Sequence, residues 1–173
     1  AHTDALTGLL NKVYAEHTIS EWLREKDFED LQALMIIDMD YFKQINDTYG
    51  HATGDQVLKI FAGFLKEQFR TTDIIGRVGG DEFMILMKNV RLDYSIHLHL
   101  QKLYTNLQNI DIPELNDQKL SCSIGCAVAP TDAESFSQLY RLADHALYTA
   151  KHNGRGRFVI YHDIKNQQET VLS

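Results

Sequence analysis

The sequence predicts an α/β (α+β) fold, in which helices flank a central, mainly antiparallel sheet of about five strands in βαββαβ order with additions. Three observations predict it. Short apolar runs fit buried strands, and between them apolar residues recur at helical spacing. Two of the runs flank Gly79-Gly80-Asp81-Glu82, which is typical of a β-hairpin. With 173 residues, 44% of them hydrophobic, the chain has enough apolar material for one domain.

The expected elements follow the chain in a regular alternation. They are a helix at 12–25, a strand at 31–37, a short helix at 41–48, a helix at 57–69, hairpin strands at 74–78 and 83–87, a helix at 96–107, a strand at 120–128, a helix at 139–150 and a last strand at 158–161. The first strand is continuously apolar, as a strand buried on both faces should be. Gly50 and Gly54 indicate a turn before the 57–69 helix, and Gly154 ends the 139–150 helix.

We expect residues 1–162 to form the domain and residues 163–173 to be a polar tail, with a sensor or linker segment upstream of Ala1. The chain carries 24 acidic and 17 basic residues, a formal net charge of -7. That balance argues against broad electrostatic binding to nucleic acid or to an anionic membrane. No apolar run approaches the roughly 20 residues that span a bilayer. We therefore expect a soluble, cytoplasmic domain, which can also be the cytoplasmic part of a membrane-anchored protein.

Two cysteines, Cys122 and Cys126, stand in the strand expected at 120–128. Four residues of extended chain separate them by about 13 Å, which is too far for a disulfide. We expect two buried free thiols, as in a reducing compartment.

Four acidic residues stand at the ends of strands that we expect to be neighbours. Asp38 and Asp40 end the first strand, and Asp81 and Glu82 lie at the hairpin turn. Carboxylates that converge without compensating bases repel one another, so a divalent cation is their natural partner. Ligands that are all oxygen favour magnesium or manganese over zinc. The alternative is that each acid only serves a turn or a helix cap.

Two further features are able to bind phosphate. Gly79 and Gly80 lack Cβ atoms, so they can adopt a positive φ and allow a phosphate or base to approach closely. The helix expected to begin near Tyr41 has free N–H groups at its start, and Lys43 adds a positive charge there.

A pair of basic residues, Lys151 and Arg155, lies four residues apart where the 139–150 helix ends, so both can point towards one anion. The alternative is that they only complement the negative end of the helix dipole.

Taken together, these segments resemble the GGDEF domain family of diguanylate cyclases. The name motif stands as Gly79-Gly80-Asp81-Glu82-Phe83, and four other blocks are similar to family motifs. They are Asp4-Ala5-Leu6-Thr7-Gly8-Leu9-Leu10-Asn11-Lys12, Asp38-Met39-Asp40-Tyr41-Phe42-Lys43-Gln44-Ile45-Asn46-Asp47, Gly50-His51-Ala52-Thr53-Gly54-Asp55 and Ala146-Leu147-Tyr148-Thr149-Ala150-Lys151 with Gly154-Arg155. Lys12 replaces the family's usual Arg, and Gly156 replaces its usual Asn. The resemblance implies a fold akin to polymerase palms and nucleotide cyclases.

The resemblance also implies roles for particular residues. The catalytic and metal-binding set, for Mg²⁺ or Mn²⁺, is Asp38, Met39 through its carbonyl oxygen, Asp81 and Glu82. The guanine edge falls to Asn46 and Asp55, and the phosphates to Phe42, Lys43, Lys151 and Arg155, beside the turn glycines Gly79 and Gly80.

The implied reaction condenses two GTP molecules into cyclic di-GMP and two pyrophosphates. Because one domain of this family binds one GTP, catalysis requires a homodimer. Two alternatives stay open: a catalytically silent domain that binds GTP or cyclic di-GMP as a regulatory module, and a cyclase with another nucleotide preference, which Asp55 disfavours.

A tetrapeptide upstream of the hairpin, Arg70-Thr71-Thr72-Asp73, resembles the family's R-x-x-D site for inhibition by product. Arg70 offers a planar fork to guanine or phosphate, and Asp73 can accept from guanine N–H groups. The alternative is an ordinary surface ion pair.

Overall fold

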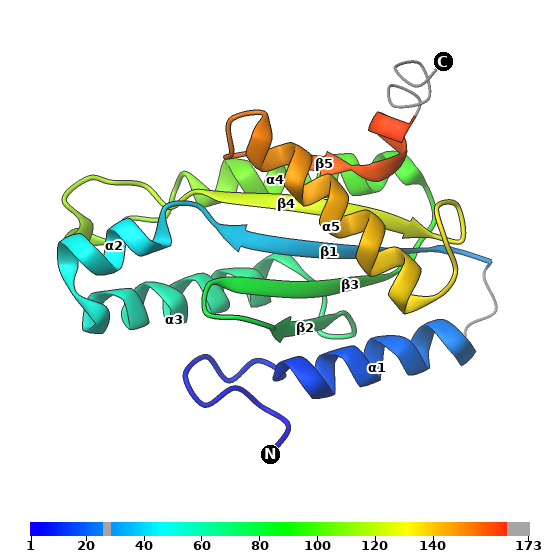
Figure 1. Cartoon of the computed structure of the whole chain (residues 1–173), viewed down its shortest axis with the longest axis horizontal. Helices are drawn as coiled ribbons and strands as arrows, with labels where there is room; N and C mark the ends of the chain where they lie inside the picture. The colour runs from blue at the N-terminus through cyan, green and yellow to red at the C-terminus, as the bar shows by residue number, and fades with distance from the viewer. Residues whose placement is uncertain (26–28, 166–173) are drawn as a thin grey trace.

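The structure is a computed structural model that describes residues 1–25 and 29–165 (Figure 1). Its elements are α1 (Lys12–Glu25), β1 (Leu31–Met39), α2 (Phe42–Tyr49), α3 (His51–Gln68), β2 (Ile74–Arg77), β3 (Glu82–Val90), α4 (Asp93–Leu107), a 3-10 turn (Pro113–Leu115), β4 (Cys122–Ala129), α5 (Phe136–His152) and β5 (Phe158–Ile160). The five strands form one sheet in the order β2-β3-β1-β4-β5. Only β4 and β5 pair in parallel, so the predicted fold class, with a mainly antiparallel sheet, is confirmed.

The central strand β1 is buried on both faces, as its unbroken apolar sequence predicts. Its side chains alternate between the two sides of the sheet. Met35, Ile37 and Met39 join the core cluster that contains the apolar residues of α3 and α4. Leu34 and Ile36 join the second cluster, with α1 and α5. The helices therefore cover the sheet in two layers, with α1 and α5 in front in Figure 1.

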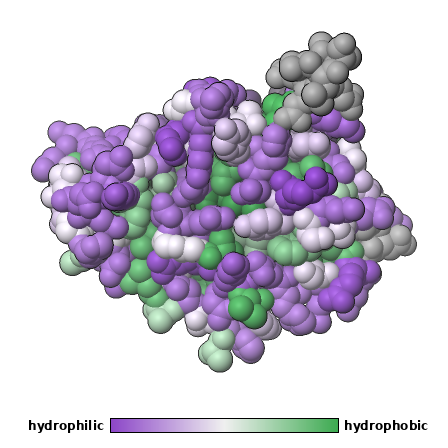
Figure 2. Space-filling view, viewed as in Figure 1, coloured by the Kyte–Doolittle hydropathy of each residue, from purple (hydrophilic) through white to green (hydrophobic). Residues whose placement is uncertain are grey.

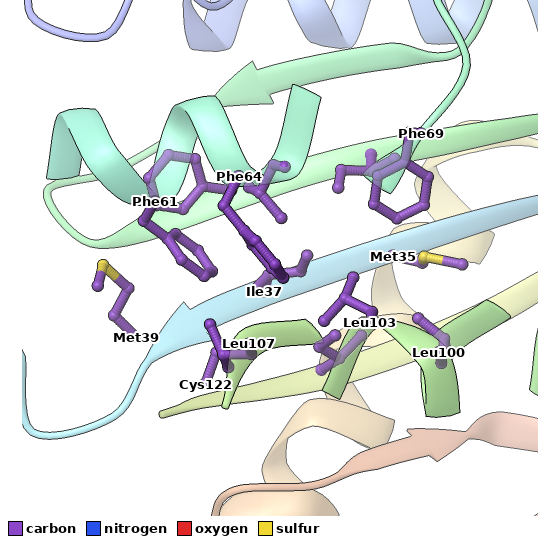
Figure 3. Packing of buried hydrophobic residues seen from close by; sticks show 14 of the residues in the cluster. Met35, Ile37, Met39, Phe61, Phe64, Phe69, Leu100, Leu103, Leu107 and Cys122 are labelled. Carbon is purple, nitrogen blue, oxygen red and sulfur yellow. The ribbon is translucent and has the colours of Figure 1, made fainter. Parts of the chain in front are cut away.

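Aromatic packing fastens α3 to the sheet. Phe61 of α3 is fully buried and meets the ring of Phe83 of β3 edge-on, with ring centroids 5.3 Å apart. Phe64 stacks on Phe61 at 6.0 Å (Figure 3). Since edge-on and offset rings add to the gain from burying apolar area, these contacts fix α3 behind the hairpin strand β3.

Several boundaries differ from the sequence prediction. Gly54 was expected in a turn, but α3 already begins at His51, and Gly54 is buried inside it. The first strand runs on to Met39, because Asp38 and Met39 still pair with Ser123 and Cys122 of β4. Of the expected polar tail, residues 163–165 belong to a short helical turn. The rest, residues 166–173, lies outside the described residues.

Hydrophilic residues cover most of the face seen in Figure 2, and hydrophobic ones show mainly across its middle. Among the helices of residues 1–25 and 29–165, none is long and apolar enough to cross a membrane. Cys122 and Cys126 are buried free thiols, as predicted.

Candidate active site

Acidic side chains converge where β1 runs beside the start of β3. Asp38 pairs in register with Glu82, and the Met39 amide donates to the Asp81 carbonyl at 3.1 Å. The structure therefore brings Asp38, Asp81 and Glu82 to one end of the sheet. Met39 has its side chain in the core, only 4% exposed, so it can face this site through its backbone alone.

The charges in this cluster are only partly balanced. Lys151 of α5 pairs its ammonium with Asp38 Oδ2. The other oxygen, Asp38 Oδ1, is buried and has no hydrogen-bond partner among the described residues. Burial and the nearby charge of Asp38 raise the pKa of both Asp81 and Glu82, and the exposed Asp144 of α5 adds to the effect on Glu82. One lysine thus faces several carboxylates, and the negative charge that it leaves unbalanced would attract a cation.

The donors present suit a hard cation, because they are all oxygen and one of them lacks a partner. Within the described residues no three His, Cys, Asp or Glu side chains are already arranged as a metal-binding group. A site here would therefore combine the carboxylates of Asp38 and Asp81 with backbone oxygen and with oxygen from a ligand, as magnesium sites at phosphates usually do.

Asp40 does not join these carboxylates, so the expectation that it converges with them is wrong. It is 4% exposed, and it accepts hydrogen bonds from the hydroxyls of Ser121 and Ser123 and from the Gly156 amide. Arg155 Nη1 lies 4.0 Å from the same carboxylate. Asp40 lies after the end of β1, and it instead anchors the loop after α5 through the Gly156 amide, beside Ser123 of β4 and Ser121 just before that strand.

The hairpin turn is open above its glycines. Gly79 and Gly80 are exposed, and a Cβ atom on Gly80 would meet nothing within 4 Å. Neither is among the residues with a positive φ, so the turn needs these glycines for open space rather than for an unusual backbone conformation. The Gly79 amide donates to the Glu82 carbonyl at 3.2 Å.

Arg77 holds this turn, a role that the sequence reading missed. Its guanidinium donates to the carbonyls of Gly79 and Gly80, at 2.8 Å for the shortest contact. It also forms an ion pair with Asp4 at 3.1 Å. Burial would raise the pKa of Asp4, but hydrogen bonds from Thr7 and Arg77 outweigh burial and lower it. The available signal was an arginine two residues before Gly-Gly.

The helices α2 and α3 meet at very close range beside the acidic cluster. A Cβ atom on Gly54 would lie 1.8 Å from Asn46 Oδ1 and 3.3 Å from Phe42 Cζ. The absence of a side chain at Gly54 therefore lets Asn46 lie against α3. Asp55, the next residue of the helix, is exposed.

The start of α2 is free to bind an anion. Tyr41 precedes the helix at φ 59°, with no side-chain cap on the first amides in the described structure. Lys43 is exposed in the first turn, and the ring of Tyr41 lies 5.6 Å from the Arg155 guanidinium. Lys151 and Arg155, expected to share one anion, lie against Asp38 and Asp40 respectively.

The Arg70–Asp73 pair forms a corner at the edge of the sheet. The Asp73 side chain is 1% exposed, whereas that of Arg70 is 54% exposed. Asp73 accepts hydrogen bonds from the Arg70 amide at 2.9 Å and from the Arg70 guanidinium at 3.3 Å. It also accepts from the Lys88 amide at 2.9 Å. Arg70 is therefore the member that a ligand reaches first, and Asp73 holds it in place.

Comparison with known proteins shows the family of this chain. The family model "Diguanylate cyclase, GGDEF domain" matches residues 1–157, and the chain belongs to the GGDEF domain family. It is 36% identical over 171 residues to the probable diguanylate cyclase DgcT of Escherichia coli, covering 96% of this chain and 37% of the relative. It is 35% identical to the diguanylate cyclase TpbB of Pseudomonas aeruginosa, covering 90% of this chain and 36% of the relative. The chain thus spans less than half the length of these relatives.

Solved structures give the same result. The GGDEF domain of TpbB, also called YfiN, matches with a TM-score of 0.87 and 33% identity, covering 96% of this chain and 99% of that one. The GGDEF domain of DgcB from Caulobacter crescentus, in complex with cyclic di-GMP, matches with a TM-score of 0.84 and 27% identity, covering 94% and 96%.

Proposed function

We propose that this domain is a diguanylate cyclase, which condenses two GTP molecules into cyclic di-GMP and two pyrophosphates. The observation that carries the proposal is the convergence of Asp38, in β1, with Asp81, which lies just before β3 and accepts at its carbonyl from the Met39 amide. One carboxylate oxygen, Asp38 Oδ1, is buried and has no hydrogen-bond partner among the described residues. The buried free thiols of the domain, Cys122 and Cys126, fit the reducing cytoplasm. The domain acts there alone or as the cytoplasmic part of a membrane-anchored protein.

A divalent cation, Mg²⁺ or Mn²⁺, would be held by Asp38, Asp81 and the Met39 carbonyl oxygen, with Glu82 assisting. When bound, it supplies charge that neutralises the triphosphate and favours ionisation of a ribose 3'-hydroxyl. Lys151, already within the cluster, remains near Asp38 to offset the remaining negative charge.

The substrate phosphates lie at the open turn of Gly79 and Gly80 and at the uncapped start of α2, where Phe42 and Lys43 stand. Arg155 adds a guanidinium at the edge. The 3'-oxygen of one GTP attacks the α-phosphorus of another, the bond to pyrophosphate breaks, and the hydroxyl proton passes to a carboxylate of the turn.

Two domains must face each other for this reaction, because each holds one GTP and each phosphorus is attacked by the ribose of the other. Two such attacks close the ring of cyclic di-GMP. The active form in this proposal is therefore a homodimer.

Guanine is selected by Asn46, which lies against Gly54 where α2 meets α3, and by Asp55, the next residue of α3. A carboxylate accepts the ring N–H and amino donors of guanine, and adenine lacks that arrangement. Because an adenine would leave these polar groups unpaired, we expect GTP to bind and ATP not to bind. Equal affinities would refute the assignment of this pocket.

Product inhibition is part of the proposal. Cyclic di-GMP binds at the Arg70–Asp73 corner, away from the turn, and holds the two domains in an arrangement that separates their active sites. The solved complex of DgcB with cyclic di-GMP, at 27% identity, supports binding of this ligand by a similar domain.

A second candidate is a catalytically silent domain that binds GTP or cyclic di-GMP as a regulatory module. It is favoured by the 32% identity, over 97% of this chain, to the E. coli protein named cyclic di-GMP phosphodiesterase PdeR, of which the chain covers 25%. The intact Asp38, Asp81 and Glu82 favour the cyclase.

Incubation of the purified domain with Mg²⁺ and GTP, followed by separation of the nucleotides, tests the cyclase. The unmutated domain should form cyclic di-GMP, and Asp81→Ala should form none while keeping its fold by circular dichroism. Turnover by Asp81→Ala would reject the assignment of that carboxylate, and GTP binding without turnover by the unmutated domain would favour the silent module.

A further inference from the structure

Lys88 of β3 connects the Arg70–Asp73 corner to the body of the domain. Its amide donates to Asp73 Oδ1 at 2.9 Å, and its carbonyl accepts from Arg70 Nη2. Both contacts use backbone atoms, so the Lys88 side chain is free to reach elsewhere. The corner and this one peptide segment therefore hold each other in place.

The side chain of Lys88 extends to helix α1. Its ammonium lies 3.9 Å from the centre of the Trp22 ring, a cation–π contact. The Trp22 indole in turn donates to Gln32 Oε1 at 2.9 Å. Gln32 is fully buried at the start of β1 and also accepts from the Asn89 amide at 3.0 Å. Trp22 thus contacts both Lys88 and Gln32, and Gln32 in turn holds the amide of Asn89, the residue after Lys88.

We infer that binding of a cyclic dinucleotide at Arg70 is coupled to helix α1 through Lys88 and Trp22. The inference rests on the proposed product-binding role of the Arg70–Asp73 corner and adds to it a second site, the face of α1 that carries Trp22. In the ligand-free arrangement Arg70 donates to Asp73 and to the Lys88 carbonyl. In the ligand-bound arrangement the fork of Arg70 donates to the ligand.

The direction of the coupling follows from these contacts. A ligand that accepts from Arg70 Nη2, the nitrogen that donates to both Asp73 and the Lys88 carbonyl, removes the donor from that carbonyl. The peptide that joins Lys88 to Asn89 then loses the donor on its carbonyl but keeps the Asn89 amide on Gln32. It can therefore turn about that remaining hydrogen bond, at Asn89, whose backbone is left-handed with φ 53°. The Lys88 side chain is then held less firmly over the indole, and the ring becomes more hydrated. Because linkage is reciprocal, any change that weakens the Lys88–Trp22 contact should favour the ligand.

Trp22 is the one tryptophan of the chain, so its fluorescence reports on this contact without a label. We expect cyclic di-GMP to shift the emission to longer wavelength, with a midpoint that matches the Kd from titration calorimetry. Arg70→Ala should show neither binding nor a shift on titration. Calorimetric binding by the unmutated domain with no change in emission would overturn the coupling.

Lys88→Met gives the sharper test, because it removes the ammonium and leaves the backbone contacts to Asp73 and Arg70. We expect it to bind cyclic di-GMP about two- to fivefold more tightly, the factor that a cation–π contact at a partly exposed site is worth, and to lose most of the emission shift. The control is Lys59→Met, an exposed lysine of α3, which should behave like the unmutated protein. Unchanged or weaker binding by Lys88→Met would contradict the coupling.

A ligand-free measurement separates this inference from product binding itself. Arg70→Ala removes the donor from the Lys88 carbonyl, so its own emission should already be shifted relative to the unmutated domain. If the unmutated domain binds no cyclic di-GMP, product inhibition fails. The spectrum of Arg70→Ala then still decides the coupling, and an unshifted spectrum rejects it.

Discussion

At the residue scale, the candidate site combines a few side chains whose charges are incompletely balanced. Asp38 has one oxygen on Lys151 and the other without a donor among the described residues. Such an arrangement costs stability in the metal-free domain and is relieved when a cation binds. The carboxylates that are proposed to bind the metal therefore lower the stability of the metal-free domain.

This cost can be measured with Asp81→Asn. The pKa of Asp81 is raised by burial and by Asp38, so the folded domain binds a proton more readily than the unfolded chain and loses stability as pH rises through the raised pKa. In EDTA at neutral pH, Asp81→Asn should be as stable as the unmutated domain or more stable, by less than about 1 kcal/mol because the group is partly exposed. A clearly lower midpoint in calorimetry would contradict the repulsion.

A second residue-scale prediction concerns His162, which follows β5. It lies 3.0 Å from Asp93 and 3.6 Å from Asp132, with Asp163 at 3.7 Å and the His97 ring nearby. Contact with Asp132, and then the charge of Asp93, raises its pKa to about 9. Because the folded pKa lies above the unfolded value, this stabilisation is complete below about pH 6.5 and is lost as pH rises through about 9.

Denaturation of the unmutated domain and of His162→Gln across pH 6 to 10 tests this. The variant should be about 1 to 2 kcal/mol less stable at pH 6, since one pKa unit is worth about 1.4 kcal/mol and solvent screens part of it. The difference should shrink above pH 9. A difference that stays constant with pH would show that packing, rather than charge, is lost.

At the element scale, the close meeting of α2 and α3 places the residues proposed to bind guanine. Gly54 allows this contact, because any side chain there would collide with Asn46. The sequence showed a glycine and suggested a turn, since the pattern of one chain does not reveal which helix will pack against it.

The neighbourhood of Asp38 and Asp81 was predictable, because a buried strand and the hairpin that follows it can pair in one sheet. The turning of Asp40 towards Ser121 and Ser123 was not, because it depends on β4, which lies about 80 residues away.

A matched pair of substitutions in α3 tests the role of Gly54. Gly54→Ala should push Asn46 aside and weaken GTP binding by about tenfold, the value of one polar contact of roughly 1.4 kcal/mol. Gly63→Ala, on the same helix with open space around it, should leave GTP binding unchanged and stabilise the domain by about 0.5 to 1 kcal/mol through helix propensity. Equal GTP affinity in the two variants would remove Asn46 from the pocket.

At the scale of the whole molecule, one sheet carries two functional regions. The acidic cluster and the Gly79–Gly80 turn lie at one end of β1 and β3, and the Arg70–Asp73 corner contacts Lys88 near the other end of β3. Arg77 ties the turn to the N-terminal segment through Asp4, and Lys88 ties the corner to α1 through Trp22. Both regions are thus fastened to the first part of the chain, before β1.

The most direct test of the cyclase measures cyclic di-GMP formed from GTP and Mg²⁺ over a range of protein concentrations. In the proposed reaction each domain supplies one GTP, so the rate per domain should rise with concentration until dimers saturate, and Asp81→Ala should form no product at any concentration. A domain that binds GTP but forms no cyclic di-GMP throughout that range would contradict the account, and so would a rate per domain that does not depend on concentration while the protein stays monomeric in sedimentation.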